Sequence, residues 1–222
     1  MSRSQVGFIF DWDGVVVDSS SIHEKSWTAL AGELDLELPE NHFREGFGKR
    51  NSFIIPQILK WTNNPSEIKK WGMRKEELYR EFGDAEGIQL TSGIRSFLNK
   101  LKENKIPAVI GTSTERKNIE LAFAQLDLED FFLGAICSED VSKGKPNPEV
   151  FLKGANILRK RPVACVVFED SPHGIKAAKS AGMKAVGLTT SQSEEVLHDA
   201  GAEIIATSPQ FLKLDSILEL FN

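Results

Sequence analysis

Residues 6–18 read VGFIFDWDGVVVD, and they form the most informative stretch of the chain. The apolar run at its start ends abruptly in Asp11 and Asp13, and Gly14 follows at once. A short apolar run with such a break is typical of a strand that is buried on both faces. In an open parallel sheet, ligands bind at the carboxyl ends of the strands. We therefore expect two acids at a position where a ligand would bind.

Two acids at this position allow more than one chemistry. Together they can bind a hard cation, or one can attack an electrophile while the other moves protons. Asp and Gly after a strand are also ordinary turn residues, so this motif alone leaves a purely structural role open.

The composition limits the classes of protein to consider. The chain has 222 residues, a formal net charge of −5 and 41% hydrophobic residues, which fits one large domain or a domain with an insertion. No apolar run approaches the roughly 20 residues that span a bilayer, and the N-terminus lacks the apolar segment of a secretory signal. Cys137 and Cys165 lie in apolar runs, which favours buried free thiols. We therefore expect a cytoplasmic protein without zinc, membrane contact or a nucleic-acid partner.

Apolar runs alternate with helix-like stretches along most of the chain. Residues 92–104 and 148–158 place apolar side chains at helical spacing. Strands are expected over five segments rich in Val, Ile and Ala: residues 6–10, 106–111, 163–168, 184–188 and 203–206. This alternation predicts a parallel sheet that is covered by helices on both faces.

Residues 19–88 interrupt the alternation. They carry Trp27, Leu30 and Leu34 on one helical face, then further helical pieces and no convincing strand. We expect a helical insertion after the first strand. Its two connections to the core lie on one side, which suits a hinged lid.

Two further segments carry polar residues after apolar runs. The run IPAVIG ends in Thr112 and Ser113, where a hydroxyl and free N–H groups can hold a phosphate oxygen or can simply cap a helix. In the loop KGKPNP, the prolines stiffen the chain, so that Lys145 can be held in place and can offset negative charge. Lys143 is expected to be a solvated surface residue.

A fourth segment, VACVVF, ends in Glu169 and Asp170. Together with Asp11 and Asp13, these residues would place four carboxylates at one edge of the sheet. That much unpaired negative charge is strongly unfavourable. A divalent cation is the simplest remedy, and ligands that are all oxygen favour Mg²⁺.

These four segments, in this order, resemble the haloacid dehalogenase superfamily, in the branch of β-phosphoglucomutase and sugar-phosphate phosphatases. FDWDGVVVDS matches the first motif, GTST the second, KGKPNPE the third and FEDSPHGIKAAKSAGM the fourth. The resemblance implies an α/β fold: a Rossmann-like, doubly wound parallel sheet over residues 1–17 and 89–222, with an inserted α-helical cap over residues 18–88. It also implies Mg²⁺-dependent phosphoryl transfer with a small phosphorylated metabolite as substrate.

The resemblance also implies a role for each motif residue. Asp11 would be the nucleophile that forms an aspartyl phosphate, and Asp13 the acid/base that protonates the leaving oxygen. Thr112 would bind the phosphate with the backbone of Ser113, while Lys145 balances charge between phosphate and nucleophile. The Mg²⁺ ligands would be Asp11, Asp13 through its main-chain carbonyl, Glu169 and Asp170.

Three cap positions are similar to those of β-phosphoglucomutase: His23, the pair Lys49–Arg50 and Lys75. The pair falls where the mutase has an arginine that grips a distal phosphate. An ungapped match puts Lys49 at that position, and a lysine there would lose the bidentate grip. His23 can instead simply pack on the first cap helix, and Lys75 is expected to be exposed on a charged helix.

Three functions remain open at this point. The sequence favours a phosphatase that acts on a small phosphorylated sugar or related metabolite, with water as acceptor. The second is a mutase, in which a sugar hydroxyl replaces water and the cap must exclude water. The third is a non-catalytic binding protein, and the intact set of Asp11, Asp13, Lys145 and Asp170 argues against it. The chain is expected to be a monomer or a homodimer.

Overall fold

A six-stranded parallel sheet forms the centre of the computed structural model, which describes residues 5–222. β1 (Gly7–Phe10) lies between β4 (Ala108–Gly111) and β6 (Cys165–Glu169) and pairs with both. The order β5-β4-β1-β6-β7-β8 is completed by β5 (Ala135–Ile136), β7 (Lys184–Leu188) and β8 (Ile204–Ala206). The five predicted strands are therefore confirmed, and β5 was not predicted.

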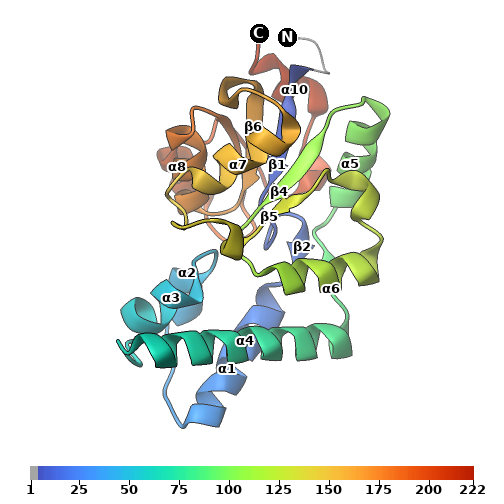
Figure 1. Ribbon diagram of the computed structural model, residues 1–222. Coiled ribbons are helices and arrows are strands. Elements are labelled where there is room, and N and C mark those ends of the chain that lie inside the picture. The colour runs from blue at the N-terminus through green and yellow to red at the C-terminus, as the bar shows by residue number, and fades with distance from the viewer. Residues whose placement is uncertain (1–4) are drawn as a thin grey trace.

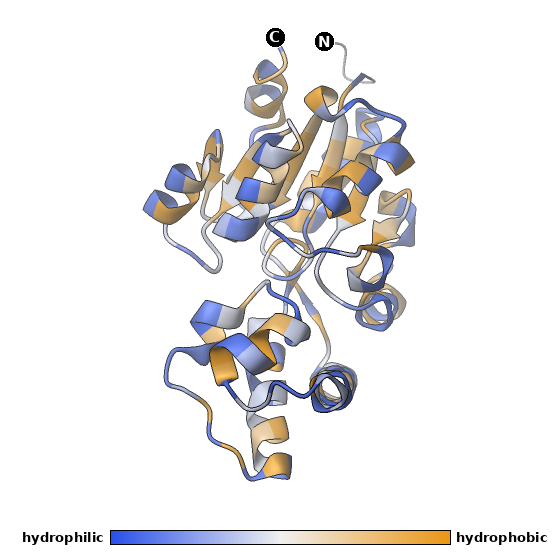
Figure 2. Ribbon diagram, turned by 60° about the vertical axis from the view of Figure 1, so that its left-hand side comes forward, coloured by the Kyte–Doolittle hydropathy of each residue, from blue (hydrophilic) through white to orange (hydrophobic). Residues whose placement is uncertain are grey.

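Side chains of the strands alternate between two hydrophobic clusters, one on each face of the sheet. Phe8 and Phe168 belong to one cluster, and Ile9 and Val167 to the other. The first cluster includes residues of α5 (Ile94–Glu103), α6 (Arg116–Leu126) and α10 (Leu214–Glu219). The second includes residues of α7 (Glu149–Leu158), α8 (Pro172–Ser180) and α9 (Glu194–Ala200). The sheet is thus doubly wound, and Figure 2 shows its strands as largely hydrophobic.

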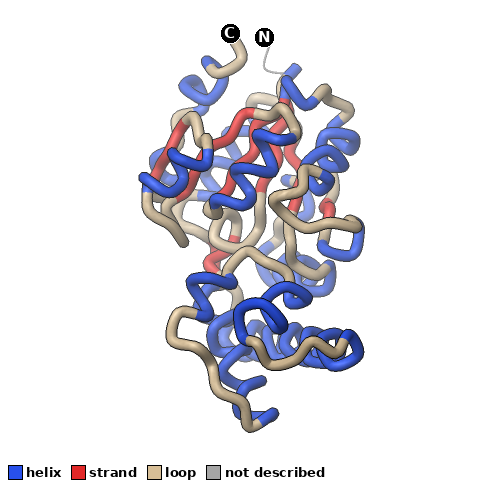
Figure 3. Tube along the Cα trace, turned by 90° about the vertical axis from the view of Figure 1, so that its left-hand side faces the viewer, coloured by secondary structure: helices blue, strands red, loops and turns tan. Residues whose placement is uncertain are grey.

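The helices of residues 19–88 form a separate layer below the sheet (Figures 1 and 3). They are α1 (Ser20–Leu34), α2 (His42–Gly46), α3 (Asn51–Phe53), the π-helical segment Ile54–Leu59 and α4 (Pro65–Glu86). Trp27, Leu30 and Ile55 are buried in a hydrophobic cluster within this layer. No strand lies within residues 19–88, as predicted. Because the layer has its own cluster, we propose that residues 18–88 form a cap domain.

A short antiparallel ribbon connects the two parts. β2 (Val17–Asp18) pairs with β3 (Gln89–Leu90), and the Thr91 N–H donates to the Val16 carbonyl at 3.0 Å. Strands of two residues are too short to show an alternating pattern, so the sequence did not reveal them. The two connections therefore act as one linking element.

The remaining elements are short. Short 3₁₀ turns lie at Glu129–Phe131, Ser138–Asp140, Pro162–Ala164 and Pro209–Phe211. Cys137 and Cys165 are buried free thiols, as predicted. Within residues 5–222, none of the helices combines the length and the apolar character that a membrane crossing requires.

A buried carboxylate ties the cap to the core. Glu76 of α4 accepts hydrogen bonds from Asn118 of α6 at 2.6 Å and from Asn51 of α3 at 2.8 Å, and it pairs with Lys75 at 3.0 Å. Burial by itself raises the pKa of Glu76, but the charge of Lys75 and the hydrogen bond from Asn51 outweigh it and hold this pKa below its ordinary value of 4.5. The ionised carboxylate therefore stabilises the junction of cap and core.

Replacing this carboxylate should give a pH-dependent loss of stability. We expect Glu76→Gln to lower the free energy of unfolding by about 2 kcal/mol at neutral pH, because a charged acceptor is lost. Since the folded-state pKa of Glu76 is lowered, its contribution is complete above about pH 4.5 and declines as the pH falls below that value. Urea titrations of both proteins between about pH 7 and pH 3.5 measure the difference. Glu120→Gln, at an exposed position of α6, is the matched control, and a deficit independent of pH would contradict the prediction.

Candidate active site

Asp11 and Asp13 lie directly after β1, at the carboxyl edge of the sheet, and both are buried. The Asp11 N–H still donates to the carbonyl of Phe168 at 2.9 Å, so strand pairing fixes the first acid. Gly14 has φ 76°, and a Cβ at this residue would lie 2.1 Å from Asp170 Oδ2. Both the left-handed φ and this close approach require glycine. The turn therefore brings the two acidic segments of the sequence together.

A buried lysine faces the first acid. Lys145 Nζ lies 2.8 Å from Asp11 Oδ1 and 2.5 Å from Glu169 Oε1. Burial lowers the pKa of Lys145, but the two carboxylates outweigh this effect and raise it above its ordinary value. Its loop is fixed by Glu149, whose carboxylate accepts a hydrogen bond from the Lys143 N–H at 3.1 Å. Lys145 is thus a fixed cation, whereas Lys143 is exposed, as predicted.

Asp11, Glu169 and Asp170 form a buried acidic cluster in which one oxygen of each lies within 4.8 Å of the others. Glu169 Oε2 accepts hydrogen bonds from the N–H groups of Asp170 and Ser171 at 3.0 and 2.9 Å, whereas Asp170 Oδ1 is buried without a hydrogen-bond partner. Burial and the charge of Glu169 raise the pKa of Asp11 to about 8, against the opposing effect of Lys145. Burial and the two neighbouring acids likewise raise the pKa of Asp170 well above its ordinary value. Oxygen ligands with an unused lone pair fit a divalent cation such as Mg²⁺.

The Asp13 carboxylate has a different set of partners. Its Oδ1 accepts a hydrogen bond from Ser19 Oγ at 2.6 Å and lies 3.1 Å from His23 Nε2, and its Oδ2 accepts one from the Thr114 hydroxyl. Burial by itself raises the pKa of Asp13, but the His23 ring and the hydroxyl donors bring it below its ordinary value. The side chain of Asp13 is not part of the acidic cluster, so only its main-chain carbonyl is left for the metal role that the resemblance implies.

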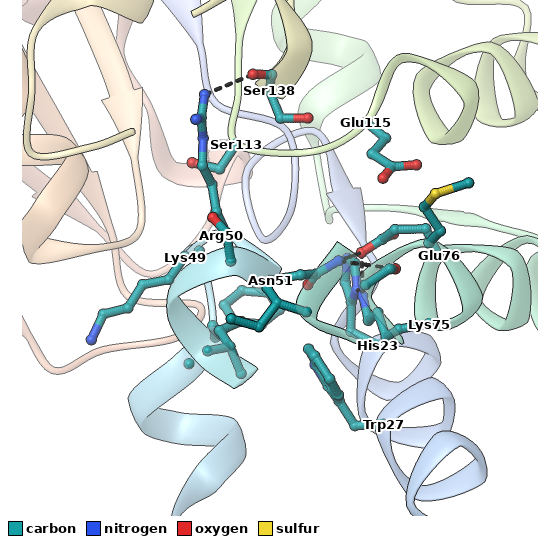
Figure 4. Close-up of a pocket in the computed structure, with 18 of the residues that line it drawn as sticks. His23, Trp27, Lys49, Arg50, Asn51, Lys75, Glu76, Ser113, Glu115 and Ser138 are labelled. Atoms are coloured by element: carbon teal, nitrogen blue, oxygen red, sulfur yellow. Dashed lines mark hydrogen bonds and ion pairs between the residues drawn. The ribbon is translucent and has the colours of Figure 1, made fainter. Parts of the chain in front are cut away.

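A hydrogen-bonded chain continues from Asp13 into the cap, and Figure 4 shows three of its members, His23, Lys75 and Glu76, close together. His23 Nδ1 lies 2.5 Å from Lys75 Nζ, and the His23 ring stacks on Tyr79 with 4.3 Å between centroids. Because an ammonium only donates, His23 Nδ1 accepts, and its Nε2–H donates to Asp13. Lys75 is 2% exposed and also pairs with Glu76. The prediction that Lys75 is solvent-exposed is therefore wrong.

The two predicted phosphate ligands directly follow β4. Thr112 is buried, and its Oγ1 accepts a hydrogen bond from the Thr114 N–H at 3.1 Å. Ser113 and Asp13 both line a cavity of about 600 Å³. α6 has Glu115 at its N-cap position, so Thr112 and Ser113 do not cap that helix. The helix-capping alternative is therefore wrong for this pair, and phosphate binding by it stays a prediction.

The basic pair in the loop before α3 has its own partners. Arg50 Nη2 donates to the carbonyls of Ser138 and Val141 at 2.7 and 2.9 Å, so this cap residue binds the main chain of the core. Lys49 Nζ lies 5.0 Å from the centroid of the Phe53 ring. Figure 4 shows Arg50 reaching toward Ser138, and Lys49 extending away from the other labelled side chains. The structure thus brings His23 and Lys75, but not this pair, to the second acid.

Three hydroxyl residues at the site were not predicted. Ser19 and Thr114 donate to the second acid of the motif, and Thr190 Oγ1 donates to the Gly14 carbonyl at 2.7 Å and lies 3.3 Å from Asp170 Oδ2. Thr190 follows β7 at the same edge of the sheet, so its place after an apolar run is a signal that could have found it. Thr114 follows β4 and carries the same signal, whereas Ser19 carries none, because hydroxyl residues are common in turns.

Comparison with known proteins supports the family resemblance that the motifs indicate. The haloacid dehalogenase-like hydrolase family matches residues 8–188. An Arabidopsis thaliana relative, the chloroplastic 5-amino-6-(5-phospho-D-ribitylamino)uracil phosphatase, is 32% identical over 205 residues, which are 91% of this chain and 54% of the relative. The chain thus spans about half the length of that protein. The β-phosphoglucomutase of Bacillus subtilis is 30% identical over 221 residues, which are 95% of this chain and 93% of the relative.

Comparison with solved structures gives the same family. The crystal structure of β-phosphoglucomutase from Clostridium difficile superposes with a TM-score of 0.85 at 27% identity, over 100% of this chain and 98% of that chain. The match therefore includes both the sheet and the helical layer below it. The α/β fold and the predicted resemblance are confirmed, and the non-catalytic alternative is set aside. The chain belongs to the haloacid dehalogenase-like hydrolase family, in the branch of β-phosphoglucomutase and sugar phosphatases, and is an enzyme of the phosphohydrolase or phosphosugar mutase type.

Proposed function

We propose that the chain is a Mg²⁺-dependent phosphatase for a small phosphorylated metabolite, a sugar phosphate or a related monoester, and that it acts through an aspartyl phosphate. One observation carries the proposal: two buried carboxylates, two positions apart, have opposite surroundings. Asp11 faces Lys145 and the acidic cluster, whereas Asp13 is held by Ser19, His23 and a threonine hydroxyl. Acids with different surroundings can divide nucleophilic and proton-transfer roles.

In the first step, an Asp11 oxygen attacks the phosphorus of the bound monoester, and the bond to the leaving oxygen breaks. Thr112, the Ser113 backbone and Lys145 hold the phosphoryl oxygens, and Lys145 reduces the repulsion between two anions. Asp13 gives its proton to the leaving oxygen. The product of this step is an aspartyl phosphate and a free alcohol.

In the second step, water attacks the phosphorus, and the bond to Asp11 breaks, which releases inorganic phosphate. Asp13, now ionised, takes the proton of the water. The contacts from Ser19 and His23 favour this ionised form. The first step needs the protonated form of Asp13. If cap movement loosens the His23 contact before this step, the pKa of Asp13 rises and the carboxyl group can carry the proton.

Four residues would hold the metal: Asp11, Asp13 through its main-chain carbonyl, Glu169 and Asp170. The buried, unpartnered Oδ1 of Asp170 and the mutual repulsion of the acids support this assignment. When bound, Mg²⁺ supplies positive charge that favours the ionised nucleophile and stabilises the phosphoryl oxygens.

A phosphosugar mutase is the second candidate. The chain of contacts Lys75–His23–Asp13 favours it, because it makes the proton state of Asp13 depend on the position of the cap. A mutase needs such coupling so that water is excluded while a sugar hydroxyl accepts the phosphoryl group.

Amide variants of the two acids test the division of labour. We expect Asp13→Asn to lower kcat by about 10²–10⁴-fold, the usual contribution of a general acid/base. Asp11→Asn should abolish turnover, because an amide does not form the intermediate. The measurement is phosphate release, combined with acid quenching of the wild type to trap phosphorylated protein. Phosphate release that persists unchanged in Asp11→Asn would refute the mechanism.

Removal of metal should affect both activity and stability. We expect chelation to abolish phosphate release and Mg²⁺ to restore it. Mg²⁺ at 100 times its Kd should also stabilise the fold by about 2.7 kcal/mol, visible as a higher Tm. Asp170→Asn should lose most of this Tm increase, whereas Asp199→Asn, at an exposed position of α9, should keep it. Equal increases in both variants would place the ion elsewhere.

³¹P NMR separates the two candidate functions. With Mg²⁺, β-glucose 1-phosphate and a trace of glucose 1,6-bisphosphate, a phosphatase gives an inorganic phosphate signal, which is the result we expect if this sugar is accepted. Conversion to glucose 6-phosphate without inorganic phosphate would identify a mutase instead.

A further inference from the structure

The cavity that contains Asp13 is larger than a single sugar requires. Its volume is about 600 Å³, within the range of cavities that enclose drug-sized ligands. At about 30 Å³ per water molecule, it has room for roughly twenty waters, whereas a hexose has about twelve non-hydrogen atoms. The cavity lies between the cap helices and the core segments that carry Ser113 and Ser138.

The lining of this cavity includes five apolar cap residues, which we call the apolar wall: Trp27, Phe43, Phe47, Ile54 and Met73. The rings of Phe43 and Phe47 lie 5.3 Å apart, and Met73 is 51% exposed. Part of this apolar surface is therefore open to solvent, and covering it with a flat apolar group would be favourable.

Arg50 lines the cavity, but its Nη2 already donates hydrogen bonds within the protein. Its Nη2 donates to two main-chain carbonyls of the core, those of Ser138 and Val141. Its side chain also packs closely on the loop of the catalytic lysine, since a Cβ at Gly144 would lie 3.1 Å from both Arg50 Cδ and Nε. Through Nη2 the guanidinium thus joins the cap to the core (Figure 4), while its Nε is buried and has no hydrogen-bond partner.

The lysines of the lining are not arranged around a second phosphate either. Lys75 is buried between His23 and Glu76. Lys49 lies over the Phe53 ring and points away from the other labelled side chains in Figure 4. Lys69 is exposed to solvent.

Carboxylates face the same space. Glu76, Glu115 and Glu139 all line the cavity, in addition to Asp13. Glu115 is partly compensated by Arg80, 3.5 Å away. Glu76 is already paired with Lys75, so the repulsion that a second anionic group would meet comes from Asp13, Glu115 and Glu139.

We infer that the substrate carries a single phosphate and that its leaving group ends in a flat, uncharged ring, which packs on this apolar wall. The inference rests on the proposed phosphatase function and names the substrate class of that same site. The phosphate end lies at Asp11, and the ring occupies the part of the cavity that a simple sugar phosphate leaves open.

The test compares two esters that share a phosphorylated ribose and differ by a planar ring. We expect kcat/KM for uridine 5′-monophosphate to exceed that for ribose 5-phosphate at least tenfold. In a second pair, fructose 1,6-bisphosphate should give no higher kcat/KM than fructose 1-phosphate. p-Nitrophenyl phosphate serves as a general phosphomonoester.

A pair of matched variants assigns the preference to the wall. Phe47→Ala should reduce the ratio of kcat/KM between uridine 5′-monophosphate and ribose 5-phosphate at least fivefold. Phe211 belongs to the sheet domain, is 63% exposed and lies outside the cavity. Phe211→Ala should therefore leave this ratio and the activity unchanged. The ratio, unlike either rate alone, is insensitive to a general loss of active protein.

The possible results separate the inference from the proposed function. Equal kcat/KM for the ribose pair, or faster turnover of the bisphosphate than of the monophosphate, overturns the inference while the phosphatase stands. If none of the esters, including p-nitrophenyl phosphate, releases phosphate, the proposed function fails and the inference falls with it.

Discussion

The structure is organised around buried negative charge at the carboxyl edge of the sheet. Asp11, Glu169 and Asp170 lie close together there, and Lys145 contacts the first two of these acids. Burial of this charge is tolerated only because the surroundings are rigid: the loop of Lys145 is fastened by Glu149, and main-chain N–H groups bind Glu169. Under the proposed function, this edge would receive the phosphate group and the divalent cation.

The second acid of the motif connects this edge to the cap. Asp13 contacts His23, and His23 contacts Lys75. Lys75 pairs with Glu76, which accepts a hydrogen bond from Asn118 of the core. Every member of this circuit is largely buried, so each contact is strengthened by a low dielectric and each missing partner is costly. The position of the cap and the proton state of the second acid are therefore linked through ordinary hydrogen bonds.

The sequence predicted the features that depend on local pattern and failed on those that depend on tertiary packing. Apolar runs that end in polar residues revealed five strands and the acidic edge, because a strand buried on both faces leaves a continuous apolar signature. β5 has only two residues, so it has no such signature. The burial of Lys75 and the attachment of Arg50 to the core were not predictable, since both depend on how the cap meets the sheet. A charged helix pattern indicates a solvated face only where nothing packs against it.

The ribbon of β2 and β3 has a consequence for the order in which the chain folds. β1 is made first, but both of its neighbours, β4 and β6, follow the helical segment, so β1 has no partner until about a hundred residues have been synthesised. The helices of the cap pack mainly on one another, and their ends are joined by the ribbon. Once they are folded, the effective loop that separates β1 from β4 shrinks to the few residues outside the ribbon and α5, which lowers the entropic cost of closing the sheet. The helical insertion thereby also helps the central strand to find its partners.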